Sequence, residues 1–517
     1  MDTKALRQKI LDLAIRGKLV PQDPSDEPAS VLLDRIRAEK QQMVKEGKLK
    51  AKDIKNDSVI FKGEDNLHYE KFADGTVNCI EDEIPFDLPD GWEWTRIQST
   101  CIINPKNQID DNLEVSFVPM AYISDGYTNS FISEKRAWKK VKKGYTHFAD
   151  GDIGIAKITP CFENKKSVIF NGLTNHFGAG TTELHIIRCF PKSLLPEYLF
   201  LFVKRDSFIV GGVQTFAGDV GQQRVTKDYI TSYLFPVPPY SEQKRIITSV
   251  KNSFDAIDQI ERSNKDIEKI VVLTKDKILD LAIRGKLVPQ DPTDEPASAL
   301  LERIRAEKEE LIKQGKIKRD KGESVIFKGE DNSYYLTDDE DISFSIPKSW
   351  MWIKHNDLFE ISGGSQPPKS YFVDKKIDGY VRLFQIRDYG KSPQPVYIPE
   401  SLASKQTDEG DILLARYGGS LGKVFKAKKG AYNVALAKVI FLQPDIVYKN
   451  FVFYYYKSSI YQKFCARMGL SRNAQSGFNK GDLSELYFPL PPLKEQIRIV
   501  KAIEDAFTIV DSIAENL

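Results

Sequence analysis

The stretch KILDLAIRGKLVPQDPSDEPAS, from Lys9 to Ser30, is repeated at Lys277 to Ser298 with one change, in which Thr293 takes the place of Ser25. A repeat of this length reveals the organisation of a chain before any other feature does. One copy stands at the start of the chain, and the other follows its middle. The chain therefore consists of two halves built on a common plan.

Other repeats continue in the same order through both halves. The first half contains VLLDRIRAEKQQMVKEGKLK (31–50), SVIFKGEDN (58–66), IPFDLPDGWEW (84–94) and FPVPPYSEQKRI (235–246). The second half contains ALLERIRAEKEELIKQGKIK (299–318), SVIFKGEDN (324–332), ISFSIPKSWMW (342–352) and FPLPPLKEQIRI (488–499). Between these repeats lie two blocks that hardly resemble each other. We therefore predict constant regions at 1–91, 239–349 and 492–517, and variable domains at 92–238 and 350–491.

A long helix is predicted at the centre of the chain. Apolar residues recur there in steps of three and four from Val250 to Leu281. Ser241 is a suitable N-cap and Gly285 a suitable C-terminal stop, so the helix spans about 45 residues, or roughly 65 Å. A helix of that length with a single apolar stripe needs a partner.

The partner helix is predicted to be split between the two ends of the chain. The last residues, Ile497 to Ile513, repeat the first half of the apolar stripe, and the first residues, Leu6 to Leu13, repeat its second half. We therefore expect helices at 494–517 and 3–17 to pack antiparallel against 241–285. The fold class is α+β, cyclically permuted and pseudo-two-fold, with one variable domain at each end of the helix pair.

Composition is that of a cytoplasmic protein of more than one domain. The 517 residues are too many for one core, with 41% hydrophobic and 29% charged residues. No apolar run approaches the roughly 20 residues that a bilayer requires, and the charged start lacks the apolar region of a signal peptide. The five cysteines and five histidines are scattered, so we expect neither a disulfide framework nor a metal site.

Both variable blocks are predicted to be small α+β domains. Each opens with a pair of tryptophans and contains a similar strand, GDIGIAKI at Gly151 and GDILLARY at Gly410. Each also contains apolar helical runs and ends in a glycine-rich polar loop, GDVGQQRV at Gly218 and GLSRNAQSGF at Gly469.

Local charge separates the variable blocks from the nearly neutral chain. Residues 350–492 hold 20 basic against 12 acidic residues, a net charge of +8, and residues 92–238 hold 17 against 14, a net charge of +3. An excess of basic charge is typical of a surface that binds a polyanion, although a solvated lysine-rich face is the alternative.

Candidate DNA contacts lie in the loops of these blocks, where arginine, lysine, glutamine and asparagine can bind phosphates or base edges. Each of these residue types also serves purely structural roles in loops, so the set is a hypothesis. In the first block it comprises Lys106, Lys157, Thr159, Gln222, Gln223 and Arg224; in the second it comprises Gln366, Lys369, Arg387, Arg416, Tyr417, Arg472, Asn473 and Gln475.

Enzyme motifs were tested and none is complete. YGGSLGKV at Tyr417 lacks the first glycine and the final Ser or Thr of a phosphate-binding loop. HFGAGTT at His176 lacks the strand and glycine spacing of a methyltransferase cofactor loop, and VPPY at Val237 lacks the leading Asp or Asn of a catalytic Pro-Pro-aromatic loop. No acidic cluster with a lysine indicates a nuclease. We predict no catalytic residue in this chain.

The repeated words resemble those of a known family. The element F-P-[VL]-P-P-x-x-E-Q-x-R-I at Phe235 and Phe488, the helix ending AIRGKLVPQDP at Ala14 and Ala282, and the two Trp-led variable blocks are similar to the specificity subunit of type I restriction-modification systems. The resemblance covers essentially the whole chain.

This resemblance implies a DNA-recognition subunit without chemistry of its own. The variable blocks would be two α/β target recognition domains, each reading one half of a bipartite double-stranded DNA site, and the helix pair would hold them apart. The chain would dock two modification (methyltransferase) subunits and, in systems that contain it, the ATP-dependent restriction subunit. S-adenosylmethionine, ATP and Mg would be bound by those partners, which methylate adenine and cleave DNA.

Two rival functions are kept beside this one. A non-catalytic scaffold whose variable domains bind proteins would show no salt-dependent affinity for DNA. An enzyme acting alone is disfavoured by the incomplete motifs.

The constant regions also contain an extra segment in each half, Pro28 to about Ser58 and Pro296 to about Ser324. Each predicts a further helix, started by Asp26 and Pro28 or by their repeats and ended by Gly47 or Gly315, with a basic linker after it. We expect each copy to pack on a modification subunit.

Overall fold

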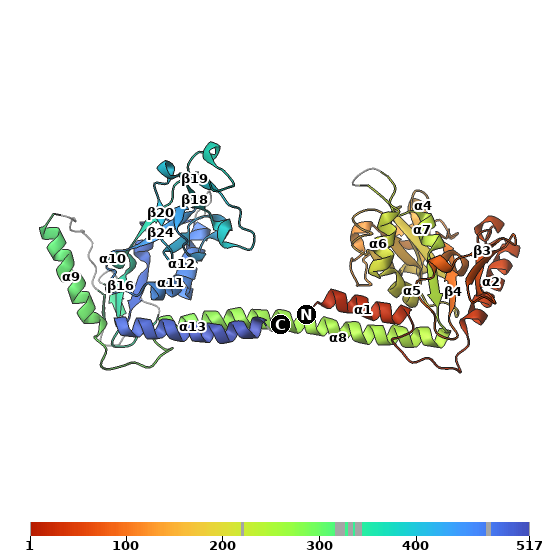
Figure 1. Cartoon of the computed structure of the whole chain (residues 1–517), viewed down its shortest axis with the longest axis horizontal. Coiled ribbons are helices and arrows are strands. Elements are labelled where there is room, and N and C mark those ends of the chain that lie inside the picture. Colours follow the sequence, from red (N-terminus) through yellow and green to blue (C-terminus); the bar gives the residue numbers. More distant parts are fainter. Residues whose placement is uncertain are drawn as a thin grey trace. The chain divides into compact units, whose positions relative to one another are not determined.

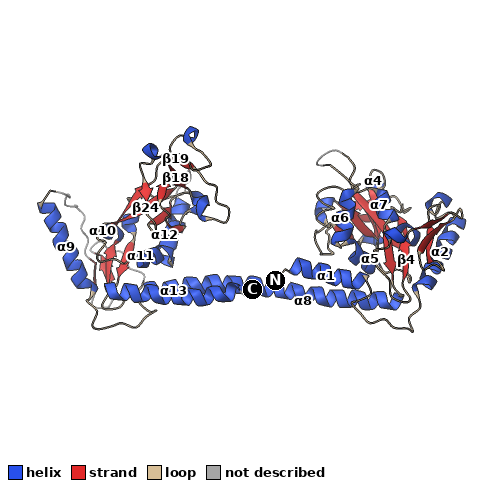
Figure 2. Cartoon of the chain, in the orientation of Figure 1, coloured by secondary structure: helices blue, strands red, loops and turns tan. Residues whose placement is uncertain are grey.

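The computed structural model describes residues 2–218, 222–315, 326–328, 334–336, 344–471 and 477–515. The chain forms two compact units, Met1–Ser263 (unit 1) and Asn264–Leu517 (unit 2). Helix α8 (Tyr240–Ile283) begins in unit 1 and continues into unit 2 without interruption. Each unit combines helices with small β-sheets, as Figures 1 and 2 show.

The described residues of unit 1 form three sheets and a two-stranded ladder. The first sheet has the order β1-β2-β3 and follows α1 (Thr3–Ile15) and α2 (Ala29–Lys45). The others have the orders β10-β9-β12-β5, β7-β6-β11-β8 and β13-β4. The strands are β1 (Ser58–Lys62), β2 (His68–Phe72), β3 (Val77–Cys79), β4 (Glu93–Arg96), β5 (Cys101–Ile103), β6 (Glu114–Val118), β7 (Glu134–Ala137), β8 (Thr146–Ala149), β9 (Ile153–Ala156), β10 (Ser167–Ile169), β11 (Phe177–Gly180), β12 (Leu184–Cys189) and β13 (Leu234–Val237). The remaining helices are α3 (Ile97–Thr100), α4 (Trp138–Val141), α5 (Pro196–Val203), α6 (Asp206–Gln214) and α7 (Lys227–Ser232).

Unit 2 repeats this arrangement with a different sequence. Its sheets have the orders β17-β24-β21-β22 and β19-β18-β23-β20, with ladders β16-β25 and β14-β15. The strands are β14 (Ile326–Lys328), β15 (Tyr334–Leu336), β16 (Met351–Lys354), β17 (Phe359–Gly363), β18 (Tyr380–Phe384), β19 (Tyr397–Pro399), β20 (Gln406–Thr407), β21 (Ile412–Ala415), β22 (Val424–Lys426), β23 (Gly430–Tyr432), β24 (Leu436–Phe441) and β25 (Tyr487–Leu490). The helices are α9 (Ala297–Lys313), α10 (His355–Leu358), α11 (Lys449–Lys457), α12 (Ser459–Ser471) and α13 (Leu493–Glu515).

Sheet topology confirms that the two units are one fold. The order β10-β9-β12-β5 of unit 1 matches β22-β21-β24-β17 of unit 2 strand for strand. A parallel pair occurs at the same place in each unit, β6 with β11 and β18 with β23. The predicted α+β class of both variable blocks is therefore correct.

Each unit pairs its share of α8 with a helix from one end of the chain, as Figure 1 shows. In unit 1, Arg7 of α1 forms ion pairs with Asp258 and Glu261 of α8, while Gln22, beyond the end of α1, reaches Glu242. The partner number falls as the residue number rises, so the helices are antiparallel. In unit 2, Lys275 of α8 pairs with Asp511 of α13, and Gln290, beyond the end of α8, reaches Glu495, so this pair is antiparallel as well. The predicted split, permuted helix pair is confirmed, whereas Met1 and Leu517 lie outside the described residues.

The repeated element P-P-x-x-E-Q-x-R-I contacts the repeated stretch that begins at Lys9 in unit 1 and at Lys277 in unit 2. In unit 1, Trp92 Nε1 and Gln22 Nε2 both donate to the Glu242 carboxylate, each at 3.0 Å. Arg245 Nη2 donates to Asp26 at 2.6 Å. Burial raises the pKa of Glu242, which is consistent with a carboxylate whose oxygens are used inside the protein.

Unit 2 makes two of these three contacts with the corresponding residues. Gln290 Nε2 donates to Glu495 at 2.6 Å, and Arg498 Nη2 donates to Asp294 at 2.6 Å. The two repeated words are therefore the two sides of one contact, made once in each unit. This contact explains why the words occur twice.

The next residue, Gln243, attaches the variable block of unit 1 to the start of α8 by hydrogen bonds. Gln243 Oε1 accepts from the Leu195 amide at 2.8 Å, and its Nε2 donates to the carbonyls of Ser193 and Pro238, both at 3.1 Å. Gln496 repeats these three bonds with Tyr448, Ile446 and Pro491. Both side chains are 0% exposed, so all three bonds have to be made inside the protein.

The shared strand signal G-D-I has a local cause. Gly151 and Gly410 adopt φ of +86° and +77°, a region that favours glycine. The aspartate that follows accepts a backbone N–H three residues back, from Ala149 to Asp152 at 2.7 Å and from Asp408 to Asp411 at 3.0 Å. Each aspartate also pairs with a cation of the neighbouring strand, Arg188 or Lys438.

The extra constant segments form helices, with one correction to their start. α2 and α9 begin directly after Pro28 and Pro296 and end before Gly47 and Gly315, as predicted. Asp26 is not part of the cap, because its carboxylate binds Arg245. In unit 1 the segment continues through a short 3₁₀ turn (Ala51–Asp53) into the sheet β1-β2-β3.

Gly17 ends α1 and provides a test of how tightly the repeated words pack. Its φ is +64°, and a Cβ there would lie 2.4 Å from Pro89 Cγ. Gly47 ends α2 at φ +72° with nothing within 4 Å of such a Cβ. We expect Gly47→Ala to lower the free energy of unfolding only by the cost of the left-handed conformation, about 1–2 kcal/mol. We expect Gly17→Ala to lower the free energy of unfolding by about 1–3 kcal/mol more, because the added methyl group would clash with Pro89. Equal unfolding free energies for the two variants in a denaturant titration would contradict this packing.

Candidate nucleic-acid interface

In unit 1 the structure brings together two candidate segments that are far apart in sequence. Lys157 to Thr159 follow β9, and Gln222 to Arg224 lie beyond α6. Ile158 and Arg224 form a β-bridge, the Thr159 amide donates to the Gln223 carbonyl at 2.9 Å, and the Val225 amide donates to the Lys157 carbonyl at 2.8 Å. Five of the six candidates of this unit are therefore neighbours at the end of β9.

Unit 2 repeats this arrangement at the end of β21. Arg416 and Tyr417 follow that strand, and Tyr417 forms a β-bridge with Gly477, on the far side of the polar loop. A Cβ at Gly477 would lie 2.5 Å from the Tyr417 ring, so only glycine allows this approach. Arg472, Asn473 and Gln475 lie outside the described residues.

Arg224 is already held by a carboxylate. Its Nε and Nη2 donate to the two oxygens of Glu183 at 2.9 and 3.0 Å, and its Nη1 donates to the Gln222 carbonyl at 2.8 Å. The hydrogen bond from Arg224 lowers the pKa of Glu183. An arginine has five N–H donors, so two remain for a ligand. Glu183 was not among the predicted residues, because it lies 41 residues from Arg224 in the sequence.

The other candidates of unit 1 differ in exposure, in hydrogen bonding and in position. The Thr159 hydroxyl donates to Glu163, whereas Gln222 is exposed. Lys106 is also exposed but follows β5 and lies near His147 of β8, whose pKa is lowered by burial and by the Lys106 charge. Lys106 therefore belongs to a different part of the unit from the other five.

Three candidates of unit 2 line one pocket. Gln366, Lys369 and Arg387 surround a pocket of about 640 Å³ together with Phe372, Gln385 and two prolines, Pro367 and Pro368. The lining contains two cations and no carboxylate. Arg387 is exposed and donates through Nη1 to Gln394 at 2.9 Å. Phe372 and Gln385 were not predicted, because nothing in their local sequence marks which loops meet.

Arg416 lies beside the same loop. Its Nη2 donates to the Tyr417 hydroxyl at 2.8 Å, and its guanidinium lies 5.0 Å from the centre of the Tyr417 ring. A Cβ at Gly363 would lie 2.6 Å from Arg416 Nη1. Because Gly363 ends β17 three residues before Gln366, the arginine is adjacent to the loop that lines the pocket.

The glycines of YGGSLGKV serve a turn. Gly418–Ser420 form one 3₁₀ turn between β21 and β22, and a Cβ at Gly422 would lie 2.9 Å from Gln462 of α12. These residues therefore pack against a helix. This packing agrees with the rejection of a phosphate-binding loop.

The described residues contain neither a metal-binding cluster nor a membrane-spanning helix. Within those ranges, no three or more His, Cys, Asp or Glu side chains gather in a way that could hold a metal ion. Nor is any described helix both long enough and apolar enough to span a bilayer.

Known proteins with similar sequences share one description. A family model described as "Type I restriction modification DNA specificity domain" matches residues 347–516. The chain is 32% identical to the type I restriction enzyme EcoEI specificity subunit of Escherichia coli, over 99% of this chain and 90% of that protein. It is 41% identical to the EcoAI specificity subunit of Escherichia coli, over 72% of this chain and 64% of that protein.

The chain belongs to the specificity subunits of type I restriction-modification systems. The resemblance carried by the repeated words is thereby confirmed. A specificity subunit is the DNA sequence-recognition member of its system and is not the catalytic one, which agrees with the incomplete enzyme motifs.

Solved structures support the same fold. A chain in a structure described as "Structural basis underlying complex assembly and conformational transition of the type I R-M system" matches with a TM-score of 0.60 and 20% identity, over 84% of this chain and 94% of that one. The HsdS subunit from Thermoanaerobacter tengcongensis matches with a TM-score of 0.50 and 19% identity, over 84% of this specificity subunit and 93% of that chain.

Proposed function

We propose that this specificity subunit reads a bipartite DNA site with two target recognition domains, 92–238 and 350–491, one half-site to each. The observation that supports this most is the repeated geometry of the candidate residues. In both units the segment after one strand, β9 or β21, forms a β-bridge with a residue from beyond the helices, Arg224 or Gly477. Two domains that share one fold but differ in their side chains suit two half-sites of different sequence.

The contacts divide into two kinds. Exposed lysines such as Lys106 and Lys369 would bind phosphates and position the domain, whereas Gln222, Gln223 and Arg387 would contact base edges in the major groove. The higher net charge of the second block, +8 from 20 basic and 12 acidic residues, gives it the larger share of the salt-dependent affinity. The protein-binding scaffold remains the alternative that a lack of DNA affinity would favour.

The enzymatic activities belong to partners in the cytoplasm. Two modification subunits would bind S-adenosylmethionine and methylate adenine, and restriction subunits, where present, would use ATP and Mg to cleave DNA. Exposed apolar residues on the helices of unit 2 support docking there: Ile270, Val272 and Leu273 of α8 are 58%, 59% and 66% exposed, and Ile509 and Ile513 of α13 are 64% and 51% exposed. Apolar patches of this kind mark protein interfaces.

A methylation assay tests whether this chain supplies the recognition of DNA while its partners supply the methyl transfer. The purified chain alone is expected to show no methyl transfer, because none of the enzyme motifs in its sequence is complete. Mixed with its modification subunits, it should direct methylation of adenine at one sequence. Activity of the chain alone, or methylation by the partners that does not depend on this chain, would contradict the proposal.

Arg387→Ala should affect only one half of the site. Loss of a bidentate base contact costs about 1–3 kcal/mol and relaxes specificity at one position. We expect binding of DNA variants to show this loss in the half-site read by unit 2, with the other half unchanged. The matched control is Lys391→Ala, which removes a nearby exposed cation that does not line the pocket. A uniform loss over all sequences would instead make Arg387 a phosphate contact.

Lengthening α8 should lengthen the gap between the half-sites. Seven residues inserted after Asn264 add two helical turns, or about 10 Å, which corresponds to about three base pairs at 3.4 Å each. The half-sites themselves should stay the same when methylated sites are mapped. The control is the same insertion after Gly75, in the open turn between β2 and β3. An unchanged gap in the α8 variant would show that this helix does not set the spacing.

A further inference from the structure

A second pocket lies in unit 1, away from the candidate DNA contacts. Its volume is about 590 Å³, and α2, β1, β2 and the β4–α3 segment surround it. The apolar part of its lining consists of Leu33, Ile54, Val59, Ile60, Phe61, Phe72, Ala73 and Trp94. The charged part consists of Arg37, Lys40, Lys71 and Asp57. Because Lys40 pairs with Asp57, the cations that remain are Lys71 and Arg37, and Arg37 also pairs with Asp34 outside the lining.

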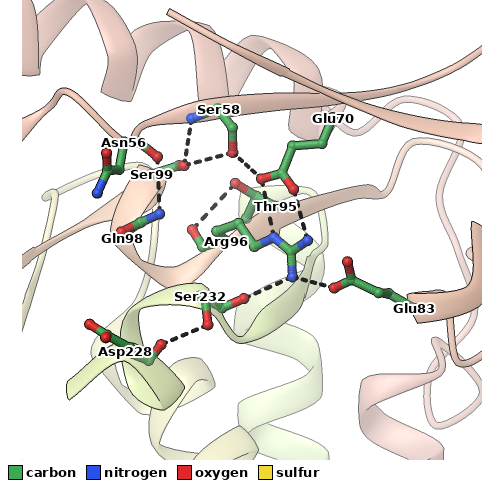
Figure 3. A network of polar contacts seen from close by, with 10 residues as sticks. All are labelled: Asn56, Ser58, Glu70, Glu83, Thr95, Arg96, Gln98, Ser99, Asp228 and Ser232. Carbon is green, nitrogen blue, oxygen red and sulfur yellow. Dashed lines mark hydrogen bonds and ion pairs between the residues drawn. The ribbon is translucent and has the colours of Figure 1, made fainter. Parts of the chain in front are cut away.

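The elements around this pocket are fixed by a polar network centred on Arg96, which Figure 3 shows. Arg96 Nη2 donates to Glu70 of β2 at 2.8 Å, and Nη1 donates to Glu83 and to the Ser232 carbonyl, both at 2.8 Å. Ser58 of β1 donates to the same Glu70 at 2.5 Å. The sheet is thereby tied to β4 and α7, so the pocket is preformed.

α2 is tied to the same structure from the other side. Lys40 is 3% exposed, donates to the Gln98 carbonyl at 2.7 Å and forms an ion pair with Asp57 at 2.5 Å. Because α2 also buries Ala29, Leu32 and Ile36, removing it would damage the core. Point substitutions are therefore the cleaner test of this segment.

β1 offers a free edge to the pocket. It pairs with β2 on one side, and the Ser58 amide turns to the other side, where it donates to Ser99 Oγ at 3.0 Å. Backbone groups alternate between the two sides of an antiparallel strand, so the N–H and C=O of Ile60 also face away from β2. No strand in the described part of the chain pairs with that edge. Five consecutive residues, Asp57 to Phe61, line the pocket.

Trp94 adds an unused donor. Its side chain is 3% exposed and lines the pocket, and its Nε1 has no hydrogen-bond partner within the described ranges. A buried N–H without an acceptor is costly. An acceptor supplied by a ligand would satisfy it.

We infer that this pocket is a docking site for an extended segment of the modification subunit, one that alternates acidic and apolar side chains and adds as a strand to β1. The backbone of the segment would bind the free edge at Ile60, its apolar side chains would cover Phe61 and Phe72, and its carboxylates would face Arg37 and Lys71. Strand addition of this kind gives affinity through main-chain bonds and specificity through side-chain pockets. The inference rests on the proposed function, since it names where that partner binds.

Affinity between the purified full chain and its purified modification subunit tests the charge requirement. Lys71→Glu reverses an exposed charge of the pocket lining, and we expect it to weaken binding about tenfold. The control is Lys52→Glu, an exposed lysine of the same segment that does not line the pocket. It should change the affinity less than twofold.

Hydrogen exchange in the same complex tests the strand addition. Ile60 is 7% exposed, but no described strand pairs with its outer backbone groups, so its amide is expected to exchange faster in the free chain than after assembly, while exposed amides of β3 remain unchanged. A complex that forms with unchanged Ile60 exchange, or with equal affinity for Lys71→Glu and Lys52→Glu, overturns the inference and leaves the proposed function intact. Failure of the wild-type chain to bind the subunit at all would overturn both.

Discussion

The buried contact between the two repeated words is the constraint on which each unit depends. At the first turn of α8 and of α13, a glutamate, a glutamine and an arginine hold three different parts of the chain in one place. Gln243 and Gln496 are completely buried, and each lost bond to such a group costs about 1–3 kcal/mol. This cost is a physical reason for the two copies of the repeated words to be nearly identical in this chain while the blocks between them differ.

That contact also explains how a recognition subunit can change its target. At Gln243 the variable block of unit 1 is attached to the start of α8 through backbone groups, the Leu195 amide and the carbonyls of Ser193 and Pro238, although side chains such as Tyr127 also contact the constant helices. Backbone groups are present whatever the side chains are. The loops that end at Gln222 to Arg224 lie outside this attachment, so their side chains can differ between the units without loss of the shared fold.

Much of the fold follows from the sequence because its signals are repeated and local. The apolar stripe gave the helices and their split, and Gly17 and Gly285 stop them at φ of +64° and +67°. The candidate loops could also be chosen from composition, since arginine, glutamine and glycine in one short segment are characteristic of a binding loop. The proximity of Lys157 to Gln223 is consistent with that choice.

Long-range partners could not be predicted in this way. The ion pair of Arg224 with Glu183, the pocket that joins Gln366 to Gln385, and the use of Asp26 to hold Arg245 rather than to cap α2 each join residues distant in the chain. A single sequence contains the spacing of such residues but not the path of the chain between them. The sheet β1-β2-β3 was missed for a related reason, because its short strands alternate only weakly between buried and exposed positions.

The central claim is that this one chain directs its complex to a DNA sequence in two separate parts. The most direct measurement is a map of methylated adenines in the genome of cells that contain the chain and its modification subunits, compared with cells that lack the chain. The account predicts one motif, made of two specified half-sites with an unspecified gap between them, that disappears when the chain is absent. A continuous motif without a gap, or methylation that persists without this chain, would contradict it.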